Sequence, residues 1–184
     1  MKEDLWLVYD RLHQELYKSL VLQVDETPVL VAKDGRPAGS KSYMWVYRTG
    51  KFYGGAPIVL YEYQRTRNII HPREFLKNYT GTCVTDGYQV YDTLEKEQEE
   101  LRVAGCWSHA RRRFANVVKA VGKEKAKGTL AYDALKQIGA IYQIEETLSQ
   151  LSSQERQQQR HLSVKPLVEA FFLWIKEQQK EVLP

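Results

Sequence analysis

The sequence predicts an α/β protein: a mixed five-stranded sheet with flanking helices and a C-terminal helical extension. Short aromatic and β-branched runs, joined by tight turns, fill the first half of the chain. Two further runs of this kind each follow a helical stretch, and the last third has apolar residues at helical spacing. The chain has 184 residues and is 43% hydrophobic and 27% charged, a composition typical of a folded domain.

The first half is expected to begin with a helix over residues 4–18, because Leu5, Tyr9, Leu12 and Leu16 recur at helical spacing. Three strands are then expected at residues 20–25, 43–48 and 56–63. The segments 33–39 and 49–51 carry glycine, and the first also proline, so they read as the turns between these strands.

The second half is expected to alternate helices and strands. Pro72 suits the first turn of a short helix. The elements expected after it are a strand at 82–86, an acidic helix at 88–100, a strand at 102–107, and helices at 108–121, 129–152 and 163–182. Ser108 is the expected N-cap of the first of these three helices. The polar, glutamine-rich run 152–160 is interpreted as a loop or a frayed helix end.

Three meandering strands, followed by two that are each reached through a helix, are the layout of the ribonuclease H-like fold. In that fold the first and fourth strands are neighbours, an adjacency that comes from the analogy rather than from the sequence. Asp25 and Asp86 stand at the predicted ends of these two strands, and each is soon followed by a chain-breaking residue, Pro28 or Gly87. We therefore expect the two aspartates to meet at the rim of the sheet.

Carboxylates gathered in this way suit hard divalent cations, the starting point of metal-assisted phosphodiester chemistry. On spacing alone, a turn or capping role for each aspartate explains the pattern equally well, since Asp is common after strands.

Charge is concentrated along the chain. Residues 91–100 hold five acidic residues and one lysine, whereas residues 101–128 hold eight basic residues and one acidic residue. A basic segment at a strand-to-helix junction suggests a polyanion partner, because helix amino termini bind phosphate. The candidate contacts to a DNA backbone are His109, Arg111, Arg112, Arg113, Arg65 and Arg67. An ordinary solvated surface remains the alternative for all of them.

The two cysteines, Cys83 and Cys106, exclude a disulfide framework and fit a reducing compartment. Together with four scattered histidines they raise structural zinc as a competing interpretation to a small buried role for Cys106. No apolar run approaches the roughly 18 residues that span a bilayer, and the amino terminus lacks the layout of a signal peptide. A cytoplasmic location without a membrane partner is expected.

Three segments, residues 24–29, 85–88 and 106–114, look in this order like the catalytic core of the insertion-sequence sixty-six family of bacterial transposases. The resemblance covers about residues 15–184. It implies a DDE-type enzyme with Mg²⁺ or Mn²⁺ at a two-metal site, in which water cleaves DNA and a 3′-hydroxyl joins it. Asp25 and Asp86 match the family's first two catalytic carboxylates.

The resemblance also implies DNA partners, namely transposon ends and target, a homo-oligomer of the intact enzyme, and association with the nucleoid when DNA is bound. The implied division is an N-terminal helix at 1–18, a partial catalytic core at 19–122 and a helical extension at 123–184.

One departure from the family concerns its third carboxylate, a glutamate within an Asn-Asn-x-x-Glu-Arg motif. This sequence has no Asn-Asn pair; Glu145, Glu146 and Glu169 are the conceivable substitutes. We therefore expect a piece of a transposase, engineered or truncated, that binds metal weakly and is inactive or nearly so alone. Two alternatives stay open: a non-enzymatic DNA-binding or regulatory piece acting through residues 101–128, and a stand-alone ribonuclease H-like nuclease with an internal third acid.

Overall fold

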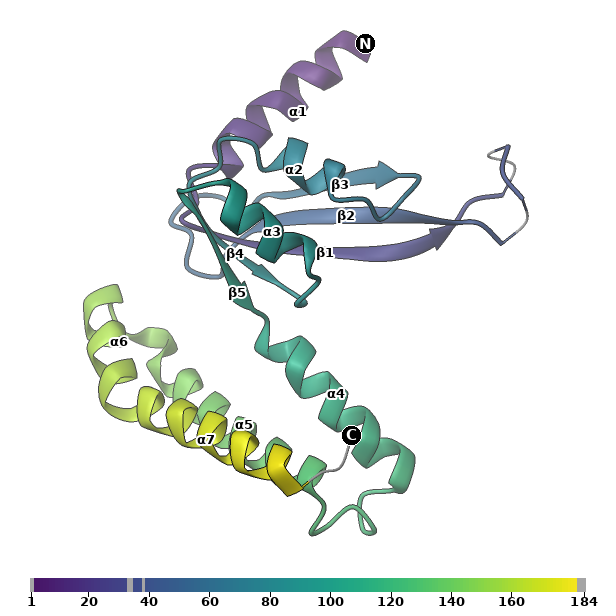
Figure 1. Cartoon of the computed structure of the whole chain (residues 1–184). Helices are drawn as coiled ribbons and strands as arrows, with labels where there is room; N and C mark the ends of the chain where they lie inside the picture. The colour runs from purple at the N-terminus through teal and green to yellow at the C-terminus, as the bar shows by residue number, and fades with distance from the viewer. Residues whose placement is uncertain (1, 33–34, 38, 182–184) are drawn as a thin grey trace. The chain divides into compact units, whose positions relative to one another are not determined.

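The computed structural model describes residues 2–32, 35–37 and 39–181, with side chains for residues 5–32, 35–37 and 39–180 (Figure 1). The chain divides into two compact units, residues 1–106 and 107–184, which we describe separately. The boundary expected from the sequence lies later, after residue 122, because the helix after the fifth strand was grouped there with the sheet.

The first unit contains one mixed five-stranded sheet in the order β3-β2-β1-β4-β5, as the sequence predicted in outline. Its strands are β1 (Val21–Leu30), β2 (Lys41–Thr49), β3 (Val59–Gln64), β4 (Gly81–Thr85) and β5 (Leu101–Gly105). The first three strands pair antiparallel, and β1 pairs parallel with β4, which pairs parallel with β5. The expected adjacency of the first and fourth strands is therefore present.

Alternation along the strands builds the core of this unit. In β1, Leu22, Val24 and Glu26 are buried, while the residues between them are exposed or partly exposed. The buried face packs with helices α1 (Lys2–Leu16), α2 (Ile70–Phe75) and α3 (Val90–Glu97) in one apolar cluster. The ring of Tyr47 on β2 stacks on Phe75 of α2 with centroids 3.4 Å apart. All three helices of the unit thus contribute to the core on one face of the sheet.

The prediction that the first strand ends at Asp25 is wrong, because β1 continues through Pro28 to Leu30. Pairing of β1 with β4 covers only Val21 to Gln23, so the rest of β1 has β2 as its paired strand among the described residues. A proline is tolerated where one side of a strand has no partner. Asp25 therefore lies within a strand, whereas Asp86 directly follows β4 as expected. The expected turn at 33–39 lies partly outside the described residues.

A close approach of two chain segments fixes the start of β4 beside β1. The Thr82 N–H donates to the Leu20 carbonyl over 2.9 Å, and the buried Tyr79 hydroxyl donates to the Ser19 carbonyl over 2.9 Å. Gly81 lies between Tyr79 and Thr82 in the chain and has a φ of 148°. A Cβ at this position would sit 2.5 Å from the Tyr79 hydroxyl oxygen. Glycine is therefore the residue that this junction requires.

The second unit is helical. It comprises α4 (Trp107–Val121), α5 (Leu130–Thr147), the 3₁₀ turn η1 (Leu148–Gln150), α6 (Ser153–Gln159), the π-helical turn η2 (Arg160–Val164) and α7 (Lys165–Glu181). Its apolar centre includes Ala134, Ile138 and Phe171, with Trp107 and Phe114 packed against them. The predicted helices at 129–152 and 163–182 are present with shorter bounds.

Two local predictions in this unit are corrected. The run 152–160, expected as a loop or frayed end, contains helix α6, which begins with a capping box: Ser152 Oγ accepts the Glu155 N–H, and the Glu155 carboxylate accepts the Ser152 N–H over 3.0 Å. Helix α4 begins at Trp107, so Ser108 lies inside its first turn rather than at the N-cap. None of the helices in the described residues combines the length and apolarity needed to cross a membrane.

Candidate functional site

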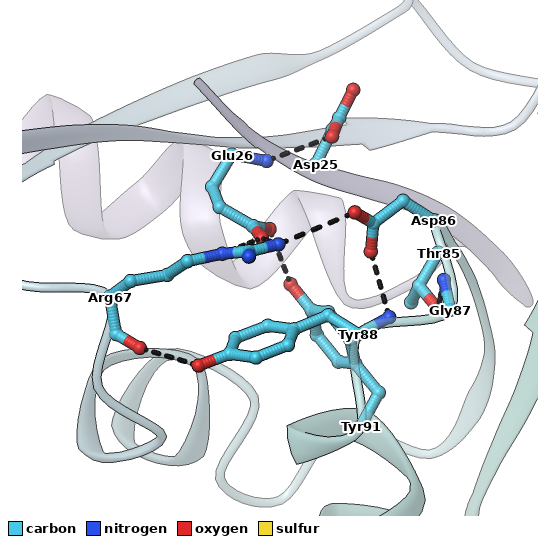
Figure 2. A network of polar contacts seen from close by, with 8 residues as sticks. All are labelled: Asp25, Glu26, Arg67, Thr85, Asp86, Gly87, Tyr88 and Tyr91. Carbon is cyan, nitrogen blue, oxygen red and sulfur yellow. Dashed lines mark hydrogen bonds and ion pairs between the residues drawn. The ribbon is translucent and has the colours of Figure 1, made fainter. Parts of the chain in front are cut away.

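The parallel pairing of β1 and β4 brings the two predicted acids to neighbouring strands. The last register pair is Gln23 with Val84, and Asp25 and Asp86 each come two residues after it. Asp25 Oδ1 accepts the N–H of Glu26 over 3.0 Å, and Asp86 Oδ1 accepts the N–H of Tyr88 over 2.9 Å. Both side chains are partly exposed, and Figure 2 shows their carboxylates pointing in different directions, that of Asp86 toward Arg67. The structure thus places Asp25 on β1 and Asp86 directly after the neighbouring strand β4; their catalytic role stays a prediction.

A third carboxylate, Glu26, lies next to them on the opposite face of β1 and was not predicted. Its side chain is 1% exposed and accepts a hydrogen bond from Arg67 Nε over 2.6 Å. The hydroxyl of Tyr91 reaches its other oxygen over 3.4 Å. Burial raises the pKa of Glu26, and the Arg67 guanidinium acts in the opposite direction. The alternation of Leu22, Val24 and Glu26 is the sequence signal that could have found it.

Arg67 lies between Glu26 and Asp86. Its Nη2 forms an ion pair with Glu26 and lies 3.4 Å from Asp86 Oδ2. Its guanidinium carbon sits 3.8 Å from the centroid of the Tyr88 ring, and the Tyr88 hydroxyl donates to the Arg67 carbonyl over 2.8 Å. Burial works to lower the pKa of Arg67, but the hydrogen bond and charge of Glu26 outweigh it and raise this pKa. Arg67 was predicted as a DNA contact. In the structure its guanidinium pairs with Glu26 and lies close to Asp86, and its contact with DNA stays a prediction.

The donor set suits a hard divalent cation in part. Mg²⁺ commonly takes one or two carboxylates, with waters and substrate phosphate oxygens completing its shell, and Asp25 and Asp86 fit that description. Within the described part of the chain, no group of three or more His, Cys, Asp or Glu side chains is placed to hold a metal. Cys83 lies in the core, where burial raises the pKa of its thiol to about 12.

The other predicted DNA contacts lie in both units. Arg65 is exposed directly after β3 in the first unit. Arg111, Arg112 and Arg113 are exposed on α4 in the second unit, a helix with no acidic residue in its first turn, and His109 is partly exposed there. These placements are compatible with phosphate contacts, which remain predictions for all five residues.

The geometry defines an α/β protein with one aspartate on β1 and another directly after the neighbouring strand β4. The family model described as "Transposase IS66 family" matches residues 1–184, so the chain belongs to the IS66 transposase family. It is similar to the uncharacterized protein y4jD of Sinorhizobium fredii, with 29% identity over 173 residues, covering 89% of this chain and 33% of the relative.

A second relative from the same organism, the uncharacterized protein y4qI, is 26% identical over 184 residues, covering 95% of this chain and 33% of the relative. The chain therefore spans about a third of the length of the curated relatives that it matches. No solved structure matches it.

Proposed function

We propose that this chain supplies part of the catalytic core of a DDE transposase, an enzyme that cuts and joins DNA, and that its sheet is a ribonuclease H-like core. The observation that carries the proposal is the parallel pairing of β1 and β4, whose last register pair, Gln23 with Val84, stands two residues before both Asp25 and Asp86. The strand order β3-β2-β1-β4-β5 and membership of a transposase family support it.

In this proposal Asp25 and Asp86 hold Mg²⁺ or Mn²⁺. A bound divalent cation of this kind activates an attacking oxygen and stabilises the leaving one. The protein's part is to hold the two carboxylates in place: Asp25 from within a paired strand, and Asp86 through the backbone N–H of Tyr88. Glu26, the third carboxylate nearby, is buried and paired with Arg67, and the described residues hold no group of three or more His, Cys, Asp or Glu placed to bind a metal. We therefore expect the isolated chain to bind metal weakly and to cleave transposon-end DNA little or not at all.

The test is Mn²⁺ binding by calorimetry to the chain and to Asp25→Asn combined with Asp86→Asn. The matched control is Asp10→Asn combined with Asp92→Asn, which removes the same formal charge from two exposed carboxylates of the first unit. We expect the site variant to lose binding and the control to keep it. Mn²⁺ binding that survives in the site variant, or that the unmodified chain lacks, would contradict the proposal.

A second candidate function is DNA binding without catalysis, favoured by the three exposed arginines at the start of α4. It predicts salt-dependent binding of DNA that is unchanged in the variant lacking Asp25 and Asp86. Titrating fluorescent duplex DNA with that variant at rising salt distinguishes the two: unchanged DNA binding combined with absent metal binding favours this candidate over the first.

A further inference from the structure

Arg67 is held by contacts from two other segments of the first unit, β1 and the stretch directly after β4 (Figure 2). Glu26 on β1 binds its Nε and Nη2, the Tyr88 ring lies against its plane, and the Tyr88 hydroxyl binds its carbonyl. Arg67 itself belongs to the connection between β3 and α2. Glu26 and the Tyr88 ring contact the side chain of Arg67, and the Tyr88 hydroxyl binds its backbone carbonyl. These contacts give Arg67 Nη2 a defined position beside Asp86 Oδ2.

Glu26 is the anchor of this arrangement. It adjoins Asp25 in the sequence, but its side chain points into the core face of the sheet and is 1% exposed. A carboxylate buried to this degree requires a charged partner, and Arg67 supplies it. The ion pair therefore connects the strand that carries Asp25 to the cation that contacts Asp86.

The Asp86 carboxylate can still bind a metal ion while Arg67 contacts it. A carboxylate offers about four acceptor positions. Arg67 lies on Oδ2, and the N–H of Tyr88 binds Oδ1. These two contacts fix the plane of the carboxylate and leave acceptor positions on both oxygens. Since Glu26 and Arg67 neutralise one another, the pair adds no net charge that would repel a cation.

We propose that Arg67 is a positioning residue: anchored by Glu26 and Tyr88, it holds the Asp86 carboxylate in the orientation that a divalent cation needs beside Asp25. The link to metal binding rests on the proposed function. Replacing the outer partners of metal ligands typically lowers metal affinity by about 10–100-fold.

Two variants isolate orientation from charge. Arg67→Lys keeps the positive charge but replaces the planar fork by a single ammonium group, which cannot span Glu26 and Asp86 in the same way. Glu26→Gln combined with Arg67→Met removes both members of the pair and also keeps the local net charge. The matched control is Arg73→Lys. Arg73 forms an exposed, bidentate ion pair with Glu97 elsewhere in the same unit. We expect Mn²⁺ affinity to fall about tenfold or more in the first two variants and to stay unchanged in the control.

A second readout needs no metal. The side-chain carboxyl ¹³C resonance of Asp86, recorded by NMR on folded protein, is expected to shift in Arg67→Lys and to stay in place in Arg73→Lys. An unmoved Asp86 resonance in Arg67→Lys overturns the proposal, and so does Mn²⁺ affinity that is unchanged or increased. If the unmodified chain binds no Mn²⁺ while the Asp86 resonance shifts in Arg67→Lys, the positioning of Asp86 is supported and the proposed metal site fails.

Discussion

Glu26 and Arg67 lie 41 positions apart in the sequence, yet Arg67 Nε donates to Glu26 Oε1 over 2.6 Å. This contact joins the middle of β1 to the connection before α2. Removing one partner of a buried ion pair leaves an uncompensated charge, whereas removing both partners is often close to neutral. The pair therefore makes a sharp prediction about single and double variants.

Arg67→Met is expected to lower the free energy of unfolding by about 3 kcal/mol at neutral pH, the low end for a buried pair because the arginine is partly solvated. Glu26→Gln combined with Arg67→Met is expected to recover most of this loss. Urea denaturation of the single and double variants checks it. Equal losses in the two would show that the buried charge is not the cause.

The loss in Arg67→Met is expected to depend on pH. Burial raises the pKa of Glu26 in the folded chain, so Glu26 binds its proton more tightly there than in the unfolded chain. The resulting stability is complete below the unfolded pKa and is lost as pH rises through the folded pKa. Without Arg67 the folded pKa rises further, so the variant should lose less stability at about pH 5 than at about pH 8. The double variant has no carboxyl at position 26, so its own free energy of unfolding should lack this contribution to the pH dependence.

Gly81→Ala is expected to destabilise the chain by about 1–3 kcal/mol, because an added Cβ meets the Tyr79 hydroxyl at 2.5 Å and the Leu20 carbonyl oxygen at 2.8 Å. The control is Gly139→Ala within α5, where the Cβ meets no atom within 4 Å. That change is expected to stabilise the helix by about 0.5–1 kcal/mol. Thermal unfolding of both variants tests the pair; an unchanged Gly81→Ala would argue against the close approach at the start of β4.

Binding of duplex DNA is expected to weaken when Arg111, Arg112 and Arg113 are all replaced by glutamine. If each arginine neutralises one phosphate, the slope of log affinity against log salt should fall in magnitude by about 2.7. The control replaces Lys136, Lys176 and Lys180, three exposed lysines of the same unit, by glutamine. Fluorescence anisotropy at several salt concentrations measures both slopes. A similar reduction in the control would mean that DNA responds to net charge rather than to the start of α4.

Much of the architecture was predictable because its signals are local. Alternating apolar residues mark the strands, and apolar residues at helical spacing mark the helices, so the element order follows from the sequence. The end of β1 was not predictable, because the tolerance of Pro28 depends on where the pairing with β4 stops. Helix α6 was missed although Ser152 and Glu155 form a recognisable capping signature.

The acidic pair was predicted from the sequence, but the ion pair of Glu26 and Arg67 beside Asp86 was not. Asp25 and Asp86 were identified by their positions after buried residues, and the structure places Asp25 within β1 and Asp86 directly after the neighbouring strand β4. Arg67 was identified only as a basic residue near a strand end. Its pairing with Glu26 depends on the packing of distant segments, and alternation along β1 indicates the burial of Glu26 without naming its partner.

The β1–β4 pairing also has a consequence for biosynthesis. On a chain emerging from the ribosome, β1 can pair early with β2 and then β3, which are its local antiparallel neighbours. Asp86 emerges only after these strands and α2. The parallel contact between β1 and β4 joins segments far apart in the sequence and encloses β2, β3 and α2 in one loop. The two aspartates therefore cannot come near each other on the nascent chain until β4 has been synthesised and this loop has closed. Any cation that the two aspartates bind together is thus acquired only once β4 has joined β1.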